Sequence, residues 1–239
     1  AFCSNLHPIG ASRILMNFEG TFSNVITLAH ELGHAYHGEQ IFKEDMLNAS
    51  YTMPVAETAS TLCETIVKRA AIEDAADQEK IFLLEQSIMG STQVIVDIFS
   101  RYTFEKNVFA ERQKGPLPVS RLKALMEEAQ EIAYGEAIDP DVRHPYMWVN
   151  KPHYYSPGLS FYNFPYAFGL LFAKGIYAEY QKQGAPFVDQ INTLLQKTGQ
   201  MSVEAVAKLI DIDVQDEAFW HASLDVIEAE IDQFLELTE

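Results

Sequence analysis

Residues 27–37 read TLAHELGHAYH. This stretch contains the pattern H-E-x-x-H, from His30 to His34, inside a run whose apolar residues recur at helical spacing. Side chains four residues apart lie one above the other on a helix, so both imidazoles can reach one ion while Glu31 faces the same cavity. Because neutral imidazole suits Zn²⁺, the stretch predicts a helix that carries a zinc site.

A catalytic zinc site needs a third protein ligand and an open position for water. The extended pattern H-E-x-x-H-x-x-G-x-x-H is excluded, because the chain has His37 and Gln40 where that pattern needs glycine and histidine. The next predicted helix offers Glu57, and Glu64 lies two turns further along the same face. We expect Glu57 to be the third ligand and Glu64 to fix the tautomer of one imidazole. His37 is expected to be an ordinary histidine outside the metal site.

The pattern along the rest of the chain predicts a mainly α fold with a small β-hairpin near the N-terminus. Strands are expected at residues 1–4 and 13–18. The first helix is expected to begin at an N-cap formed by Ser23 or Asn24. The predicted helices are 23–39, 54–71, 77–112, 120–134, 160–182, 186–197, 202–210 and 216–237, with a long loop at 135–158.

Composition limits the partners of the chain. At 239 residues and 48% hydrophobic, it can bury a substantial core. A formal charge of -17 argues against nucleic acid and anionic membranes as partners. The long uncharged run Tyr154–Ala173 is too polar and too broken by proline and glycine for a membrane span. Cys3 and Cys63 are too few for a disulfide framework, so a cytoplasmic location is expected.

Five stretches resemble the oligoendopeptidase F family, relatives of thimet oligopeptidase. They are AFCS at 1–4, RILMNFEGT at 13–21, TLAHELGHAYH at 27–37, VAETAST at 55–61 and the loop at 148–166. The resemblance implies a zincin-like helical catalytic domain over residues 1–239, as the C-terminal portion of a longer architecture. It also implies a channel that admits unfolded peptides, with zinc held by His30, His34 and Glu57 and with Glu31 as the base.

The loop at 153–166 contains His153 and four tyrosines. Peptide hydrolysis needs hydrogen-bond donors for the negative charge that grows on the carbonyl oxygen. By resemblance to the family, His153 and one or both of Tyr162 and Tyr166 supply them. The two tyrosines are four residues apart, so they are expected on one helical face, and the choice between them stays open.

The sequence therefore predicts a zinc-dependent endopeptidase that hydrolyses short unfolded oligopeptides with a metal-activated water. Two alternatives stay open. One is a zinc-binding or peptide-binding fragment without catalysis, and the other is a zinc aminopeptidase. The aminopeptidase needs an acidic anchor for the substrate amine, and no G-x-M-E-N-like segment supplies it.

Overall fold

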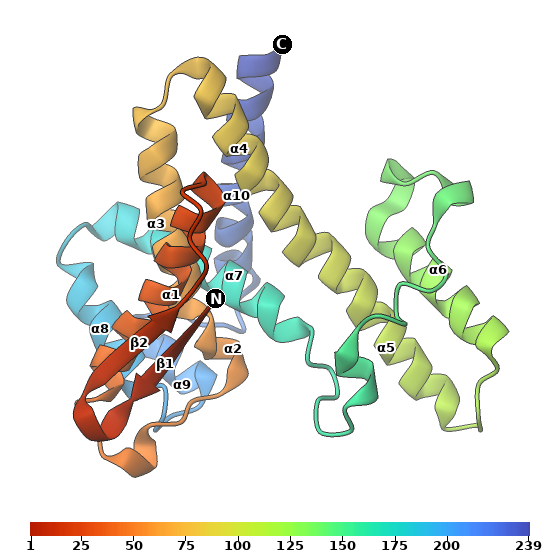
Figure 1. The fold of residues 1–239 in the computed structure, drawn as a ribbon, viewed down its shortest axis with the longest axis horizontal. Helices are drawn as coiled ribbons and strands as arrows, with labels where there is room; N and C mark the ends of the chain where they lie inside the picture. The colour runs from red at the N-terminus through yellow and green to blue at the C-terminus, as the bar shows by residue number, and fades with distance from the viewer. The chain divides into compact units, whose positions relative to one another are not determined.

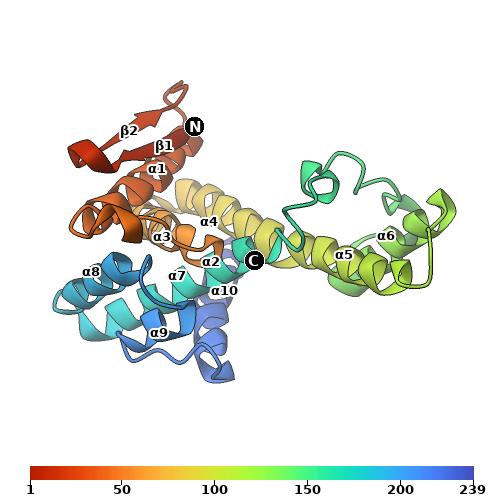
Figure 2. The ribbon, with the colours of Figure 1, turned by 90° about the horizontal axis from the view of Figure 1, so that it is seen from below.

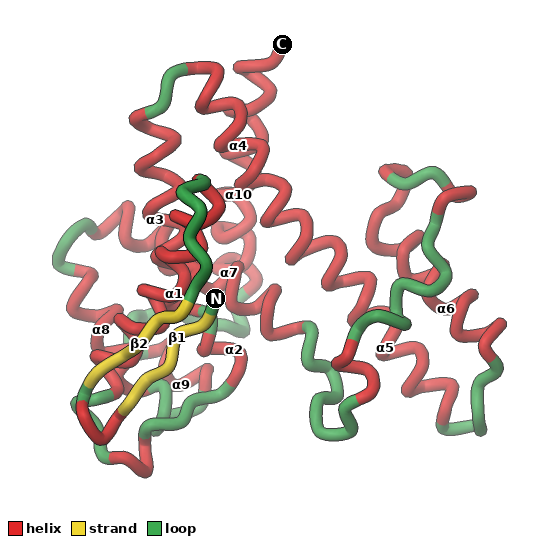
Figure 3. Tube along the Cα trace, in the orientation of Figure 1, coloured by secondary structure: helices red, strands yellow, loops and turns green.

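The computed structural model describes residues 1–239 and confirms a mainly α chain with one small sheet (Figure 3). It divides into two units. The first unit comprises Ala1–Ile88 and Phe168–Glu239, and the second comprises Met89–Ala167. The expectation of a single catalytic domain over 1–239 stays a prediction.

Most predicted helices are present, with bounds shifted by a few residues. The elements are β1 Phe2–Leu6, β2 Ala11–Leu15, α1 Phe22–Ile41, α2 Met53–Ala56, α3 Thr58–Asp74, α4 Asp77–Thr92, α5 Ile98–Arg112, α6 Val119–Tyr134, α7 Phe164–Gln183, α8 Phe187–Lys197, α9 Val203–Lys208 and α10 Glu217–Thr238. A π-helical turn at Gln93–Asp97 joins α4 to α5. The predicted loop at 135–158 contains three short 3-10 segments.

The hairpin lies beside α1 in the first unit (Figure 2). Strands β1 and β2 are antiparallel, with Phe2 paired to Leu15 and Leu6 paired to Ala11. The turn ends at Gly10, whose φ of +57° is left-handed and suits glycine. The strands are thus longer at the turn than predicted, and β2 ends before Phe18.

Helix α1 begins at Phe22, one residue before the predicted start, and its N-cap lies further back than the sequence indicated. The hydroxyl of Thr21 accepts a hydrogen bond from the Asn24 backbone N–H at 3.2 Å, so Thr21 is the N-cap. The prediction of Ser23 or Asn24 as N-cap was wrong. The Asn24 side chain instead accepts from the Glu19 backbone N–H at 2.7 Å, which fixes the chain that enters the helix.

Helices α1 and α3 pack side by side in the first unit (Figure 1). Gly33 of α1 faces the start of α3 so closely that a Cβ there would lie 2.4 Å from the Cα of Ser60. The single helix predicted at 54–71 is interrupted, because Glu57 lies between α2 and α3 with φ −90° and ψ 0°. This interruption falls on a residue predicted to bind zinc.

The core of the first unit gathers apolar side chains mainly from α3, α7, α8 and α9. Its fully buried members include Phe172, Ile176, Phe187, Leu194, Leu195 and Val206. Burial of each large apolar side chain contributes about 1.5–3 kcal/mol. This core fixes the helices that support α1 and α3.

The second unit is built on α5 and α6. Phe104, Leu125, Met126 and Ala129 form its core, and Trp148 and Tyr154 of the long loop pack against it. The hydroxyl of Tyr154 donates to the carbonyl of Arg101 at 3.1 Å. The loop is therefore tied to α5 by both packing and hydrogen bonding.

Candidate metal centre and catalytic residues

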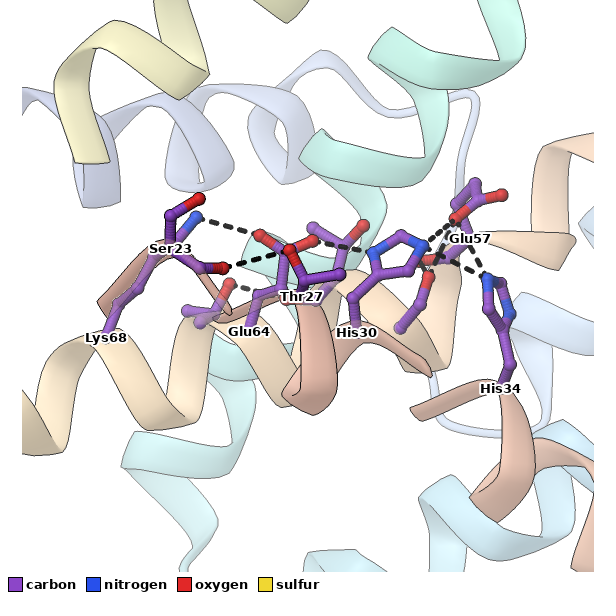
Figure 4. A network of polar contacts seen from close by, with 10 residues as sticks. Ser23, Thr27, His30, His34, Glu57, Glu64 and Lys68 are labelled. Carbon is purple, nitrogen blue, oxygen red and sulfur yellow. Dashed lines mark hydrogen bonds and ion pairs between the residues drawn. The ribbon is translucent and has the colours of Figure 1, made fainter. Parts of the chain in front are cut away.

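Helix α1 and the junction of α2 with α3 bring His30, His34 and Glu57 together, as Figure 4 shows. The Nε2 atoms of His30 and His34 are 3.1 Å apart. Oε2 of Glu57 lies 3.3 Å from Nε2 of His30 and 3.5 Å from Nε2 of His34. Three electron-pair donors thus meet at one point.

The spacing of these three atoms fits a tetrahedral zinc site. With metal–ligand distances of about 2.0–2.1 Å, a tetrahedron has ligand–ligand edges of about 3.3–3.4 Å. The observed edges of 3.1, 3.3 and 3.5 Å bracket that value. Two imidazoles and one carboxylate are also a donor set that zinc accepts in catalytic sites.

Glu64 orients the ring of His30 (Figure 4). Its Oε1 lies 2.7 Å from Nδ1 of His30, and its Oε2 accepts a hydrogen bond from Nζ of Lys68 at 2.8 Å. Burial raises the pKa of Glu64, but His30 and Lys68 outweigh that effect and lower the pKa below its ordinary value. Because an ionised carboxylate only accepts, Nδ1 of His30 donates and Nε2 of the neutral ring presents its lone pair.

The two histidines of the site have opposite pKa shifts. Burial lowers the pKa of His30, but the carboxylates of Glu64, Glu57 and Glu31 outweigh it and raise the pKa. Burial also lowers the pKa of His34, and here the shift stays downward although Glu57 opposes it. Two imidazolium rings with Nε2 atoms 3.1 Å apart would repel, so at most one of them is charged.

Three neighbours set the position of Glu57. The hydroxyl of Ser60 donates to its Oε2 at 2.8 Å. Gly169 of α7 leaves room for the Cβ of Glu57. A Cβ on residue 169 would lie only 2.9 Å from it. The close approach at Gly33 brings the start of α3 against α1. Small residues on two helices therefore allow the carboxylate to reach the imidazoles.

Glu31 and His37 are two further polar residues of α1, and they differ in their surroundings. Glu31 is 6% exposed, and its charge acts on both His30 and His34. His37 is fully buried, with its Nε2 2.8 Å from Oγ1 of Thr198. Burial lowers the pKa of His37 to about 4. The candidate group of ligand atoms comprises His30, His34 and Glu57 and does not include His37.

The aromatic residues predicted for the oxyanion lie together in the second unit. The ring centroid of His153 is 4.7 Å from that of Tyr162 and 6.5 Å from that of Tyr166, and the two tyrosine rings are 6.0 Å apart. Tyr166 lies in the first turn of α7, whereas Tyr162 precedes the helix. The prediction that both tyrosines share one helical face was wrong, because α7 begins at Phe164 and not at Ser160.

The model of peptidase family M3 matches residues 1–225 of the chain. The chain belongs to peptidase family M3. The predicted resemblance to the oligoendopeptidase F family is confirmed by this family match and by the names of the relatives.

Two curated relatives illustrate the similarity. The M3 chain is 25% identical to Oligopeptidase PepF of Bacillus subtilis over 227 residues, which are 94% of this chain and 33% of the relative. It is 28% identical to the chromosomal Oligoendopeptidase F of Lactococcus lactis subsp. cremoris over 160 residues, which are 66% of this chain and 26% of the relative. The M3 chain therefore spans a third or less of the length of these relatives.

Solved structures share the fold of the M3 chain. A chain from Chlamydophila abortus, described as a candidate peptidase, superposes with a TM-score of 0.87 at 23% identity and covers 99% of this chain and 40% of its own. Oligoendopeptidase-F from Enterococcus faecium superposes with a TM-score of 0.76 at 22% identity and covers 90% and 39%. At these identities the likeness establishes the fold alone.

One helix of the M3 chain has the length and hydropathy to cross a membrane. It runs over Asp77–Arg112, and 33% of its most apolar window is buried. A single helix of this kind is weak support for a membrane span, because buried core helices meet the same criteria. The sequence had singled out a different run, Tyr154–Ala173, for this test.

Sequence reasoning missed Ser60 and Lys68 around the metal centre of the M3 chain. Ser60 stands three residues after Glu57, at a distance that reaches back over one helical turn. Lys68 follows Glu64 by four residues, the spacing of a helical ion pair. Both signals are present in the sequence, but neither is specific without the position of α1.

Proposed function

We propose that this M3 chain is the catalytic part of a zinc-dependent endopeptidase that hydrolyses peptide bonds in short oligopeptides. One observation carries the proposal: the three donor atoms of His30, His34 and Glu57 lie 3.1, 3.3 and 3.5 Å apart. The printed names of the relatives, Oligopeptidase PepF and Oligoendopeptidase F, support peptides as the substrate class.

The three residues would hold one zinc ion per chain. Zinc, when bound, polarises the substrate carbonyl and makes a water molecule acidic enough to attack at neutral pH. The hydrogen bond from His30 to Glu64 keeps the ring proton on Nδ1, so that the lone pair of Nε2 is available to a metal ion. The hydroxyl of Ser60 donates a hydrogen bond to the carboxylate of Glu57 and so restrains its orientation.

Glu31 is proposed as the general base. It lies on α1 between the two histidines and is 6% exposed, so it is shielded from bulk water. Its carboxylate would take a proton from the attacking water and pass it to the nitrogen of the leaving amine.

His153, Tyr162 and Tyr166 are proposed to donate hydrogen bonds to the carbonyl oxygen as negative charge develops there. Their mutual contacts support a common role. The substrate backbone is proposed to pair with β2, which has a partner strand on one side only. Backbone pairing makes few demands on substrate side chains.

Metal analysis and peptide cleavage test this function together. The chain should bind one zinc ion and cleave an internally quenched peptide whose two ends are blocked. Replacement Glu31→Gln should abolish cleavage while the zinc content stays unchanged. Near-normal turnover in that variant would disprove the role of Glu31.

The same assays separate the alternatives. Zinc without cleavage would indicate a binding fragment without catalysis, an alternative that the coverage of a third or less of the relatives keeps open. Cleavage restricted to peptides with a free amino end would indicate an aminopeptidase. Absence of zinc would remove the basis of both peptidase functions and of a zinc-binding fragment, and would leave only a peptide-binding fragment. The cytoplasmic location and the absence of nucleic-acid and membrane partners stay predictions.

A further inference from the structure

Glu105 is a buried carboxylate of α5 that the proposed chemistry does not use. It is 6% exposed, and no lysine or arginine forms an ion pair with it. Its Oε1 accepts a hydrogen bond from the backbone N–H of Phe161 at 2.7 Å, while its buried Oε2 has no partner. Burying a charge costs free energy, so a carboxylate kept here for a single backbone N–H indicates a specific need for that contact.

The residue that Glu105 holds has an unfavourable backbone conformation. Phe161 has φ +56°, which is rare for a residue with a side chain and costs on the order of 1 kcal/mol or more. Surrounding contacts must therefore impose it. Besides the bond to Glu105, the Phe161 ring packs against Phe109 and Tyr102 of α5, with centroids 5.1 and 5.7 Å away.

The next residue in the chain is Tyr162. Its backbone N–H donates to the carbonyl of Leu159 at 3.2 Å, and its ring lies 4.7 Å from that of His153. A change of φ at Phe161 would swing the backbone of Tyr162 away from this position. The bond from Phe161 to Glu105 is therefore well placed to set the position of the Tyr162 ring.

We propose that Glu105 is a positioning residue for peptide hydrolysis: it holds Phe161 in its left-handed conformation and thereby fixes Tyr162. This inference rests on the proposed function, in which Tyr162 donates to the substrate carbonyl oxygen. Glu105 does not touch the substrate in this scheme.

Kinetics of the full chain test this role with three variants of α5. Glu105→Ala removes the acceptor and should lower kcat about tenfold with KM changed less than about threefold, because orientation and not binding is lost. Glu105→Gln keeps an acceptor oxygen and should stay within about threefold of the unmodified kcat. Glu111→Ala removes a carboxylate from the same helix, where its partner is Arg121, and should leave kcat unchanged.

A double-variant cycle shows whether Glu105 acts through Tyr162. Tyr162→Phe should lower kcat in the unmodified chain but have much less effect in the Glu105→Ala background, since the hydroxyl is already displaced there. Equal effects in both backgrounds would overturn the proposal. So would a Glu105→Gln variant as slow as Glu105→Ala.

Amide hydrogen exchange keeps the test independent of activity. The Phe161 amide should exchange at least about tenfold faster in Glu105→Ala, and at the unmodified rate in Glu105→Gln and Glu111→Ala. An unchanged rate in Glu105→Ala would overturn the proposal even if the chain cleaves peptides. Conversely, the chain could fail to cleave peptides and still show the expected exchange rates. That result would disprove the proposed function but would support the role of Glu105 in holding Phe161 in its conformation.

Discussion

Gly33 of α1 and Ser60 of α3 approach so closely that a Cβ on residue 33 would lie 2.4 Å from the Cα of Ser60. This contact occurs inside the H-E-x-x-H motif, between the two histidines. It sets how near α3 comes to α1, and Glu57 lies at the start of α3. The three candidate ligands can therefore come together only because residue 33 of the motif is a glycine.

Gly33→Ala should destabilise the chain by about 2–3 kcal/mol and weaken zinc binding, because the added methyl group forces α3 away from α1. Denaturant unfolding and zinc titration measure the two effects. Gly90→Ala is the matched control, since Gly90 is also helical and a Cβ there meets nothing within 4 Å. That control should be neutral or stabilising by up to about 1 kcal/mol. Equal behaviour of the two variants would contradict the packing explanation.

Zinc should stabilise the folded chain through His30, His34 and Glu57. At a free zinc concentration of about 100 times Kd, the free energy of unfolding should rise by about 2.7 kcal/mol, and chelation should reverse the rise. His34→Ala and Glu57→Ala should abolish the response. Glu236→Ala, which removes an exposed carboxylate of α10, should retain it. A full zinc response in His34→Ala would place the metal elsewhere.

Glu64→Ala should weaken zinc binding by about 10-fold to 100-fold, because the ring of His30 loses the acceptor that fixes its tautomer. Competition with a chromogenic chelator measures the change in Kd. Glu73→Ala serves as the control, since it removes an exposed carboxylate from the same helix. If both variants bind zinc like the unmodified chain, the hydrogen bond at 2.7 Å contributes nothing to affinity.

The stability of the chain should fall as pH drops, in part through His37. Its pKa is about 4 in the folded chain and 6.5 for the ordinary side chain, because burial disfavours the charged ring. Below pH 6.5 the unfolded chain therefore binds a proton that the folded chain excludes until about pH 4. This difference lowers the free energy of unfolding by about 3 kcal/mol across that window.

A comparison of two variants isolates this contribution. His37→Phe keeps a ring against Tyr51, and the Thr198 hydroxyl keeps its bond to the Leu195 carbonyl at 2.8 Å. Its free energy of unfolding should depend less on pH between 6.5 and 4. His221→Gln, at an exposed position, should follow the unmodified chain. Identical pH profiles for His37→Phe and the unmodified chain would refute the assignment.

The part of the candidate site that lies within one helix could be predicted from the sequence. The spacing from His30 to His34 is one helical turn, and the structure places their Nε2 atoms 3.1 Å apart. The seven-residue spacing of Glu57 and Glu64 also predicted that the two carboxylates face the same way. Both spacings follow from helical periodicity, which is a local property of the chain, whereas the contact of both carboxylates with the His30 ring depends on the packing of α3 against α1.

Local periodicity failed where the chain leaves regular structure. It predicted an unbroken helix through Glu57 and a helix that includes Tyr162, and the structure interrupts the first and starts the second at Phe164. The left-handed φ of Phe161 has no signal in its residue type. The carboxylate that accepts a hydrogen bond from its backbone N–H belongs to Glu105, which stands 56 positions earlier in the sequence.

The helical class and the H-E-x-x-H pattern could be recognised along the chain, because each depends on neighbours within a turn or two. The closeness of α1 and α3 at Gly33, the bond from Ser60 to Glu57 and the conformation at Phe161 could be found only in the folded chain. These depend on surfaces that meet only after the chain has folded, so no local pattern encodes them.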